Sequence, residues 1–198
     1  MEEKLTDQER ARRDKLARIE ALGVDPFGQK FERTDTAASV REKAQNKTNE
    51  ELEANPIYVT IAGRIMLLRK MGKAAFFTIR DLTGDMQAYI RVDSVGEENY
   101  ALFKCSDVGD IVGLYGRVMF TDTGEITVRV EKYTHLTKAL KPLPEKFHGL
   151  TDVEERYRHR HVDLIMNEDA RRVAMARPKI IRAIQEYCDS KGFVEVET

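Results

Sequence analysis

Two adjacent phenylalanines, Phe76 and Phe77, lie in the segment GKAAFFTIRDLTGDMQAYI of a 198-residue chain in which 34% of the residues are charged. The segment alternates apolar and polar residues, which predicts a β-strand whose successive side chains point to opposite faces. Phe77 alternates with Ala75 and Ile79 and is therefore predicted to enter the core. Phe76 shares the more polar face with Arg80, so its ring is expected on the outside of a sheet.

An aromatic ring on a polar sheet face can stack on a nucleic-acid base. Gln87, on the next predicted strand, offers an amide donor and acceptor to a base edge, and Arg69, Lys70 and Lys73 offer positive charge to a phosphate backbone. The alternative is that Phe76 packs beneath a loop or the N-terminal helices. The alternation by itself favours base stacking and packing of Phe76 equally. The neighbouring amide and cations favour the first interpretation, in which this face binds single-stranded RNA or DNA.

The residues that would carry this face lie on five predicted strands. The first begins at Tyr58 and can bend at Gly63, and the others span residues 74–80, 86–92, 110–120 and 125–131. A helical stretch at 97–104 separates the third strand from the fourth. Three strands, a short helix and two strands are the order of an OB-fold barrel, a fold that commonly presents one sheet face to single-stranded nucleic acid.

Two helices are predicted before the barrel, each opened by a capping box, Thr6 with Glu9 and Thr48 with Glu51. Gly23 ends the first, and the pair Asn55-Pro56 ends the second. Five basic residues decorate the first helix: Arg10, Arg12, Arg13, Lys15 and Arg18. A solvated face is favoured over RNA contact for this helix.

Composition excludes several classes of protein. With 41% hydrophobic residues the chain is ordinary for a globular protein, and no apolar run approaches the ~20 residues of a membrane span. The N-terminus has no apolar signal core, and the distant Cys105 and Cys188 indicate neither a disulfide framework nor a zinc site. A reducing cytoplasm is therefore expected. The net charge of −1 requires any polyanion binding to come from local clusters.

The segment after the barrel is predicted to be a connector followed by helices. Pro142 and Pro144 stiffen the connector, and Asp152 with Glu155 caps a charged helix. His159 and His161 suggest a metal site, but residues two apart on a helix face different ways, so a charged solvent- or RNA-facing helix is favoured.

A long helix is predicted to follow, capped by Asn167 and ending near residues 191–192. A strand-like stretch, 193–196, comes after it. Pro178 lies inside the helix, where a proline costs ~3 kcal/mol or starts a kink, so the sequence leaves open whether the helix continues there.

Several motifs together resemble the class II lysyl-tRNA synthetases of bacterial type. They are RKMGKAAFFTIRD and TGEITV in the barrel, LTKALKPLPEKFHGL in the connector and SKGFVEVET at the end. The connector is closer to the lysine enzymes than to the aspartate and asparagine enzymes, which share the architecture and stay as alternatives. SKGFVEVET resembles class II motif 1, which forms the dimer interface of the family.

The resemblance also implies roles for four residues in anticodon binding. Phe76 corresponds to a ring that stacks on the central anticodon base, and Gln87 to a glutamine that reads the same base. Arg69 matches an arginine at the end of the first strand, and Glu125 matches a glutamate that helps to select a flanking base. A uracil edge offers carbonyl acceptors and one N–H donor, so Gln87 and Glu125 could distinguish it from cytosine.

The implied fold is mainly β with flanking helices, in four parts. These are an N-terminal helical extension (1–57), a five-stranded OB-fold anticodon-binding barrel (58–136), a hinge (137–166) and the first helix and strand of a class II α+β catalytic domain (167–198). The implied partners are a lysine tRNA with a U-rich anticodon and, for the full-length enzyme, a second copy in a homodimer; neither DNA nor a membrane is expected.

The family's ATP-binding and metal-binding motifs would lie beyond Thr198. The full-length enzyme would use ATP and Mg²⁺ to attach lysine to tRNA, whereas this chain is expected to hold no catalytic, cofactor-binding or metal-binding residue and to be inactive alone. Two other functions stay open: a stand-alone OB-fold protein that binds single-stranded nucleic acid, and a structural or dimerisation module in which Phe76 is merely packed.

Overall fold

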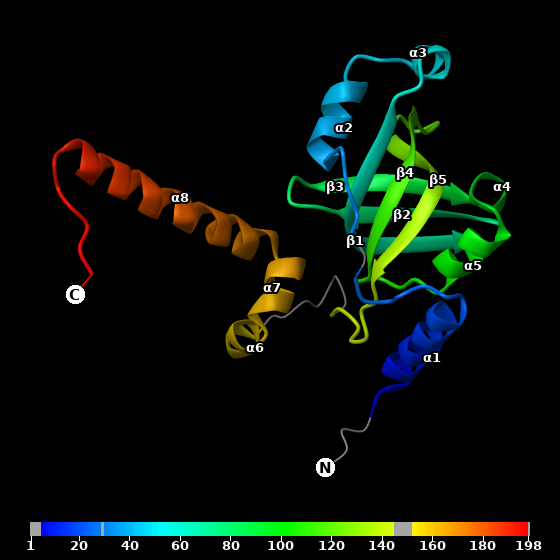
Figure 1. The fold of residues 1–198 in the computed structure, drawn as a ribbon, viewed down its shortest axis with the longest axis horizontal. Coiled ribbons are helices and arrows are strands. Elements are labelled where there is room, and N and C mark those ends of the chain that lie inside the picture. Colours follow the sequence, from blue (N-terminus) through cyan, green and yellow to red (C-terminus); the bar gives the residue numbers. More distant parts are fainter. Residues whose placement is uncertain (1–4, 29, 145–151, 198) are drawn as a thin grey trace. The chain divides into compact units, whose positions relative to one another are not determined.

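The computed structural model of the chain describes residues 5–28, 30–144 and 152–197, which fall into two compact units, Met1–Pro142 and Leu143–Thr198 (Figure 1). The first unit contains five strands: β1 (Tyr58–Met71), β2 (Ala74–Arg80), β3 (Asp85–Arg91), β4 (Ile111–Phe120) and β5 (Ile126–Thr137). They close into a barrel in the order β1-β2-β3-β5-β4. The predicted OB-fold barrel is therefore confirmed. The predicted boundaries at 57/58, 136/137 and 166/167 stay predictions, and residues 145–151 of the predicted hinge lie outside the described part.

The barrel core follows from the alternation of apolar residues along the strands. Phe77 is 1% exposed and packs against Phe103, with 5.2 Å between ring centroids, whereas Phe76 on the opposite face is only half-buried. Burying a phenylalanine side chain contributes about 1.5–3 kcal/mol. The predicted facing of the two phenylalanines is confirmed.

Strand β1 pairs with β4 along its first half and with β2 along its second half. A β-bulge between Ile65 and Leu67 separates the two halves and inverts the alternation of the strand. Gly63 is needed where β1 passes close to β2, because a Cβ atom there would lie 2.8 Å from the carbonyl oxygen of Arg80. The bulge between Ile65 and Leu67 lies just after Gly63, where the sequence predicted that the strand could bend.

Five helices surround the barrel strands in the first unit: α1 (Asp7–Ala21), α2 (Ala37–Ala44), α3 (Asn49–Ala54), α4 (Val92–Val95) and α5 (Glu97–Lys104). Both predicted capping boxes are present. Sequence reasoning missed α2, whose box pairs Thr36 with Ser39 in place of the usual Glu or Gln. It also placed Val92 in a strand, although this residue begins α4.

The basic helix α1 is attached to the barrel through two of its cations. Arg12 is 9% exposed and donates hydrogen bonds to the carbonyl oxygens of Val108 and Ala139, at 2.9 and 2.8 Å. Lys15 forms an ion pair with Asp107. The expectation that all five basic residues of this helix lie on a solvated face is therefore wrong for Arg12 and Lys15.

The second unit contains α6 (Val153–Arg158), α7 (Arg160–Met166) and α8 (Glu168–Ser190). The predicted caps are confirmed: Asp152 accepts a hydrogen bond from the Glu155 amide at 3.0 Å, and Asn167 caps α8. The question left open at Pro178 is answered, since α8 is one continuous helix there. The expected strand 193–196 is also wrong, because a strand needs a hydrogen-bonding partner and the described residues offer it none.

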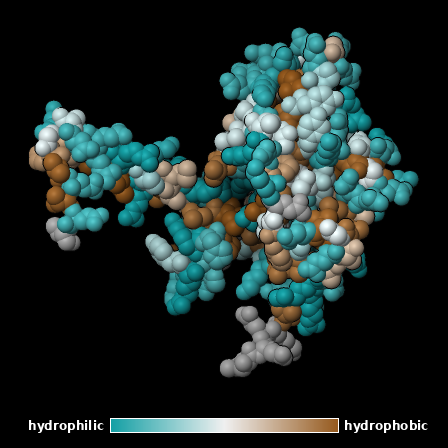
Figure 2. All heavy atoms as spheres, viewed as in Figure 1, coloured by the Kyte–Doolittle hydropathy of each residue, from teal (hydrophilic) through white to brown (hydrophobic). Residues whose placement is uncertain are grey.

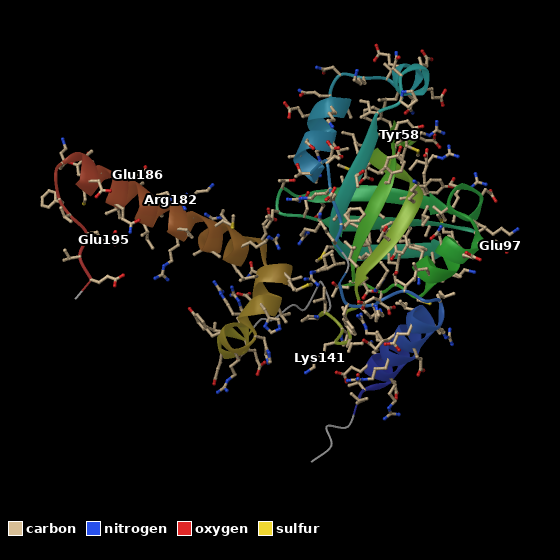
Figure 3. The ribbon with its side chains drawn as sticks, in the orientation of Figure 1. Tyr58, Glu97, Lys141, Arg182, Glu186 and Glu195 are labelled. Atoms are coloured by element: carbon tan, nitrogen blue, oxygen red, sulfur yellow. The ribbon has the colours of Figure 1, made fainter. Side chains whose placement is uncertain are left out.

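Helix α8 has one apolar side and one charged side. Val173, Ile180, Ile184 and Tyr187 recur at helical spacing and are all more than half exposed. Figure 2 shows apolar side chains among the polar ones along α8, and Arg182 and Glu186, labelled in Figure 3, project from it. None of the described helices is long and apolar enough to span a membrane.

Candidate nucleic-acid interface

A row of outward-facing side chains crosses the barrel, with one residue from each strand. The strand registers pair Arg69 with Phe76, Phe76 with Tyr89, Tyr89 with Arg129, and Arg129 with Arg117. We call these five residues the outer row. Their sequence neighbours on β2, β3 and β5 are buried, so alternation directs the row away from the core.

Two aromatic rings lie in the middle of the outer row. The Phe76 and Tyr89 rings have centroids 4.5 Å apart and planes tilted by 33°, and both side chains are half-buried. Tyr89 therefore supports Phe76 laterally on the sheet surface and holds its ring in place. Sequence reasoning did not select Tyr89, although its position two residues after Gln87 puts both on one face.

A hydrogen-bonded group lies beside this row, on strands β3 and β5. Gln87 Nε2 donates to Glu125 Oε2 at 2.6 Å, and the Thr127 hydroxyl donates to Gln87 Oε1 at 2.7 Å. Thr127 is fully buried, whereas Glu125 is exposed. The amide of Gln87 is therefore held with its oxygen towards the sheet and its nitrogen towards Glu125.

This orientation presents a donor next to an acceptor. Gln87 Nε2 keeps a second hydrogen for a ligand, and the carboxylate of Glu125 keeps free lone pairs. Uracil has a carbonyl acceptor beside its N3–H donor, which complements that arrangement. Cytosine has an amino donor beside an N3 acceptor, so its edge has the reverse pattern.

The positive charge near this site differs from the predicted cluster. Lys70 pairs with the inward-facing Ala75, and its ammonium donates to the carbonyl oxygens of Lys104 and Ser106, at 2.8 and 3.1 Å. Lys70 thus holds the end of α5 and does not lie on the same face of the sheet as Arg69. Lys73 is exposed in the turn between β1 and β2.

Arg117 and Arg129 are the basic residues that sequence reasoning missed. They belong to the outer row with Arg69, although they come from β4 and β5, far along the chain. The alternation of β5 directs Arg129 outward. Nothing in the sequence indicated that the parallel pairing of β3 with β5 would put it next to Tyr89.

His159 and His161, for which a metal site was considered, lie near each other in the second unit. Their ring centroids are 6.3 Å apart, and His159 Nε2 lies 3.4 Å from a carboxylate oxygen of Glu155. Across residues 5–28, 30–144 and 152–197, no three His, Cys, Asp or Glu side chains are grouped so that they could hold a metal ion.

Comparisons with known proteins match both units. Residues 59–136 match the family of OB-fold nucleic acid binding domains named for the tRNA anticodon, and residues 152–198 match the class II tRNA synthetases of the D, K and N type. The chain is 54% identical to a lysine–tRNA ligase of Lysinibacillus sphaericus, 51% to one of Streptococcus agalactiae and 50% to one of Bacillus subtilis.

Each of these alignments covers 99% of this chain, but it covers only 39–40% of the relative. The chain thus spans about two-fifths of the length of the relatives it matches. The chain therefore contains an OB-fold nucleic acid binding domain of the tRNA anticodon type together with a segment of the class II synthetase domain, and over almost its whole length it is similar to lysine–tRNA ligases.

Proposed function

We propose that the barrel of this chain binds the U-rich anticodon of a lysine tRNA, as part of an enzyme that attaches lysine to that tRNA. The observation that carries the proposal is the hydrogen-bonded group of Gln87, Glu125 and Thr127 beside the Phe76 ring. It combines a surface for stacking with a donor–acceptor pair that complements uracil.

In this proposal the central anticodon base stacks on Phe76, whose other edge is supported by Tyr89. Stacking of one base on an aromatic side chain contributes about 1–3 kcal/mol and does not depend strongly on the base. Gln87 reads the edge of that base through its amide, and Glu125 selects a flanking base. Arg69, next to Phe76 in the outer row, interacts with the RNA backbone or a base edge.

The remaining steps of the proposed reaction belong to the longer enzyme. Lysine, ATP and Mg²⁺ would be bound there, and the described residues of this chain contribute recognition of the RNA. We propose that the 198-residue chain alone does not form an aminoacyl-adenylate. Lysine-dependent exchange between ATP and pyrophosphate should stay at background when RNA is added, and turnover by the purified chain would contradict this.

Two further features of the enzyme are also proposals. The apolar side of α8 supports a homodimer, since exposed side chains of this kind are typical of a surface that is buried on association. The free thiols of Cys105 and Cys188 support a reducing compartment, and we propose the cytoplasm.

The proposal is tested by titrating the chain with two anticodon stem-loops that differ only in the central base, UUU against UCU. We expect tighter binding of the UUU loop at every salt concentration, because hydrogen bonds to base edges release no counterions. Gln87→Ala should reduce the preference for UUU and leave the salt dependence unchanged. Equal binding of both loops by the wild type would instead indicate a general single-strand binder.

A further inference from the structure

A pocket of about 190 Å³ lies between α3 and the strands β4 and β5. Two side chains of the outer row, Arg117 and Arg129, line it, and Asn49 and Glu53 of α3 line its other side. Both arginines are half-buried and directly opposed in the register of β4 with β5. Two guanidinium groups therefore share one concave site on the outside of the barrel.

Neither guanidinium has a hydrogen bond or an ion pair among the described residues, although Glu53 lines the same pocket. Other partly buried arginines of the barrel are satisfied. Arg64 donates to the carbonyl oxygen of Gly109 at 2.7 Å, and Arg80 forms a forked pair with Asp85. A half-buried cation without a partner loses hydration, and an anion that accepts hydrogen bonds from it compensates for this loss.

The walls of the pocket are held rigidly. The side-chain amide of Asn49 donates to the Phe120 carbonyl at 3.0 Å and accepts from the Phe120 amide at 2.8 Å, so α3 is fixed to the end of β4. At Gly116, a Cβ atom would lie only 2.0 Å from the carbonyl oxygen of Arg129, so β4 and β5 approach closely at this point. The two arginines are thus placed side by side before any ligand binds.

The pocket continues the line of the proposed base-binding residues. Arg129 is paired with Tyr89 and Tyr89 with Phe76, so two strand spacings, about 10 Å, separate the Phe76 and Arg129 positions. The start of β1 lies on the other side, since Tyr58, labelled in Figure 3, is paired with Arg117. An RNA strand whose base stacks on Phe76 can therefore pass over the pocket.

We infer that this pocket binds a backbone phosphate of the RNA, one that belongs to a nucleotide next to the base stacked on Phe76. Arginine is suited to this ligand because its planar guanidinium can donate two parallel hydrogen bonds to phosphate oxygens. Such a contact positions the strand and carries no information about base sequence. The inference rests on the proposed function, which supplies the RNA.

The test is to titrate the full chain with the UUU and UCU stem-loops at several salt concentrations, using wild type, Arg117→Gln, Arg129→Gln and the double variant. Each neutralised phosphate contributes about −0.7 to the salt slope for a single strand. We expect the double variant to reduce the steepness of the slope by about 0.7, the contribution of the one phosphate in the pocket, and each single variant to reduce it by part of that amount. Affinity should fall severalfold for both loops equally, so that the preference for UUU stays the same.

Lys132→Gln is the matched control, because it removes one charge from the same strand at an exposed position outside the pocket. It should leave the slope within error of the wild type. Arg117→Lys and Arg129→Lys keep the positive charge but lose the planar guanidinium that donates two parallel hydrogen bonds. Compared with the glutamine variants, they should recover most of the salt slope but only part of the RNA affinity. Melting temperatures equal to that of the wild type would show that all variants are folded.

The two proposals fail in different ways. If the wild type prefers UUU and Phe76→Ala weakens binding, while the arginine variants keep the wild-type slope, the phosphate pocket is wrong and the anticodon proposal stands. A change in base preference in the arginine variants would also contradict a phosphate contact. If the wild type binds neither loop, both proposals are wrong.

Discussion

The buried hydroxyl of Thr127 donates a 2.7 Å hydrogen bond to Oε1 of Gln87, across the parallel pair of strands β3 and β5. Together with the hydrogen bond from Gln87 Nε2 to Glu125, this contact decides which end of the amide faces a ligand. With its oxygen turned towards Thr127, Gln87 presents its nitrogen, which is a donor, to a base. Thr127 is therefore a positioning residue for the proposed selection of uracil.

The first prediction concerns this contact. Thr127→Val replaces the hydroxyl with a methyl group of similar size, so the amide of Gln87 loses one of the two hydrogen bonds that orient it and can turn its oxygen outward more easily. We expect the preference for the UUU loop over the UCU loop to fall about fivefold, since one hydrogen bond contributes about 1 kcal/mol. Parallel titrations of both loops measure this ratio.

Thr78→Val is the control for this prediction. Thr78 lies opposite Gln87 on the other neighbouring strand, β2, and no hydrogen bond joins the two side chains. The substitution should leave the preference unchanged. An equal loss of preference in both variants would show that the effect is one of general packing.

The second prediction separates the two adjacent phenylalanines. Phe76→Ala should weaken RNA binding by about 1–3 kcal/mol, the contribution of one stacked base, and leave the melting temperature nearly unchanged. Phe77→Ala should instead lower the free energy of unfolding by about 3–5 kcal/mol, because it opens a cavity beside Phe103. Denaturant melts and stem-loop titrations on both variants measure these effects; unchanged RNA affinity in Phe76→Ala would contradict the stacking role.

The third prediction concerns Lys70, which pattern alone placed with the phosphate-binding residues. Its ammonium bonds two carbonyl oxygens at the end of α5, so Lys70→Met should lower the free energy of unfolding by about 1 kcal/mol. The salt slope of RNA binding should not change. Arg69→Met is the comparison, since its loss should flatten the slope; a flatter slope in Lys70→Met would contradict the structural role.

The fourth prediction is a pH dependence that comes from His135. The imidazole is fully buried, neither ring nitrogen has a hydrogen-bond partner among the described residues, and burial lowers its pKa below the ordinary value. The unfolded chain therefore binds the proton more readily, near its usual pKa of about 6.5. The contribution of His135 to the free energy of unfolding should be constant above that pH and decrease as the pH falls towards 5.

Urea denaturation at pH 7.5, 6 and 5 measures this loss. His135→Leu should remove part of it, because the variant has no imidazole to protonate on unfolding. His161→Leu serves as the control, since His161 is exposed in the second unit, and it should keep the wild-type pH dependence. The same dependence in His135→Leu as in the wild type would show that other groups cause it.

The facing of Phe76 and Phe77 could be predicted because it depends only on the alternation of neighbouring residues. The helix starts at Thr6, Thr48 and Asn167 are local in the same sense, since each cap bonds amides two or three residues away. These features need no knowledge of the rest of the chain. Pattern and motif alone also led to the OB-fold barrel and to the family.

The end of β1 could not be predicted in this way. Continued from Ile61 and Ile65, the alternation would turn Arg69 inward and Lys70 outward. The bulge after Ile65 inverts this, so Arg69 pairs with Phe76 on the outside while Lys70 turns towards α5. A bulge is decided by how the strand packs against two different partners, which alternation does not record.

The sequence by itself determined the strands, the caps and the side chains that leave the core, because these depend on residues a few positions apart. Only the tertiary structure decided which of those side chains meet. Thr127 orients Gln87, and Arg129 stands beside Tyr89, because closure of the barrel pairs β3 with β5 across an intervening helix pair and strand. That register is set by packing of the whole core, since a slip of one residue would turn every buried side chain of a strand outward.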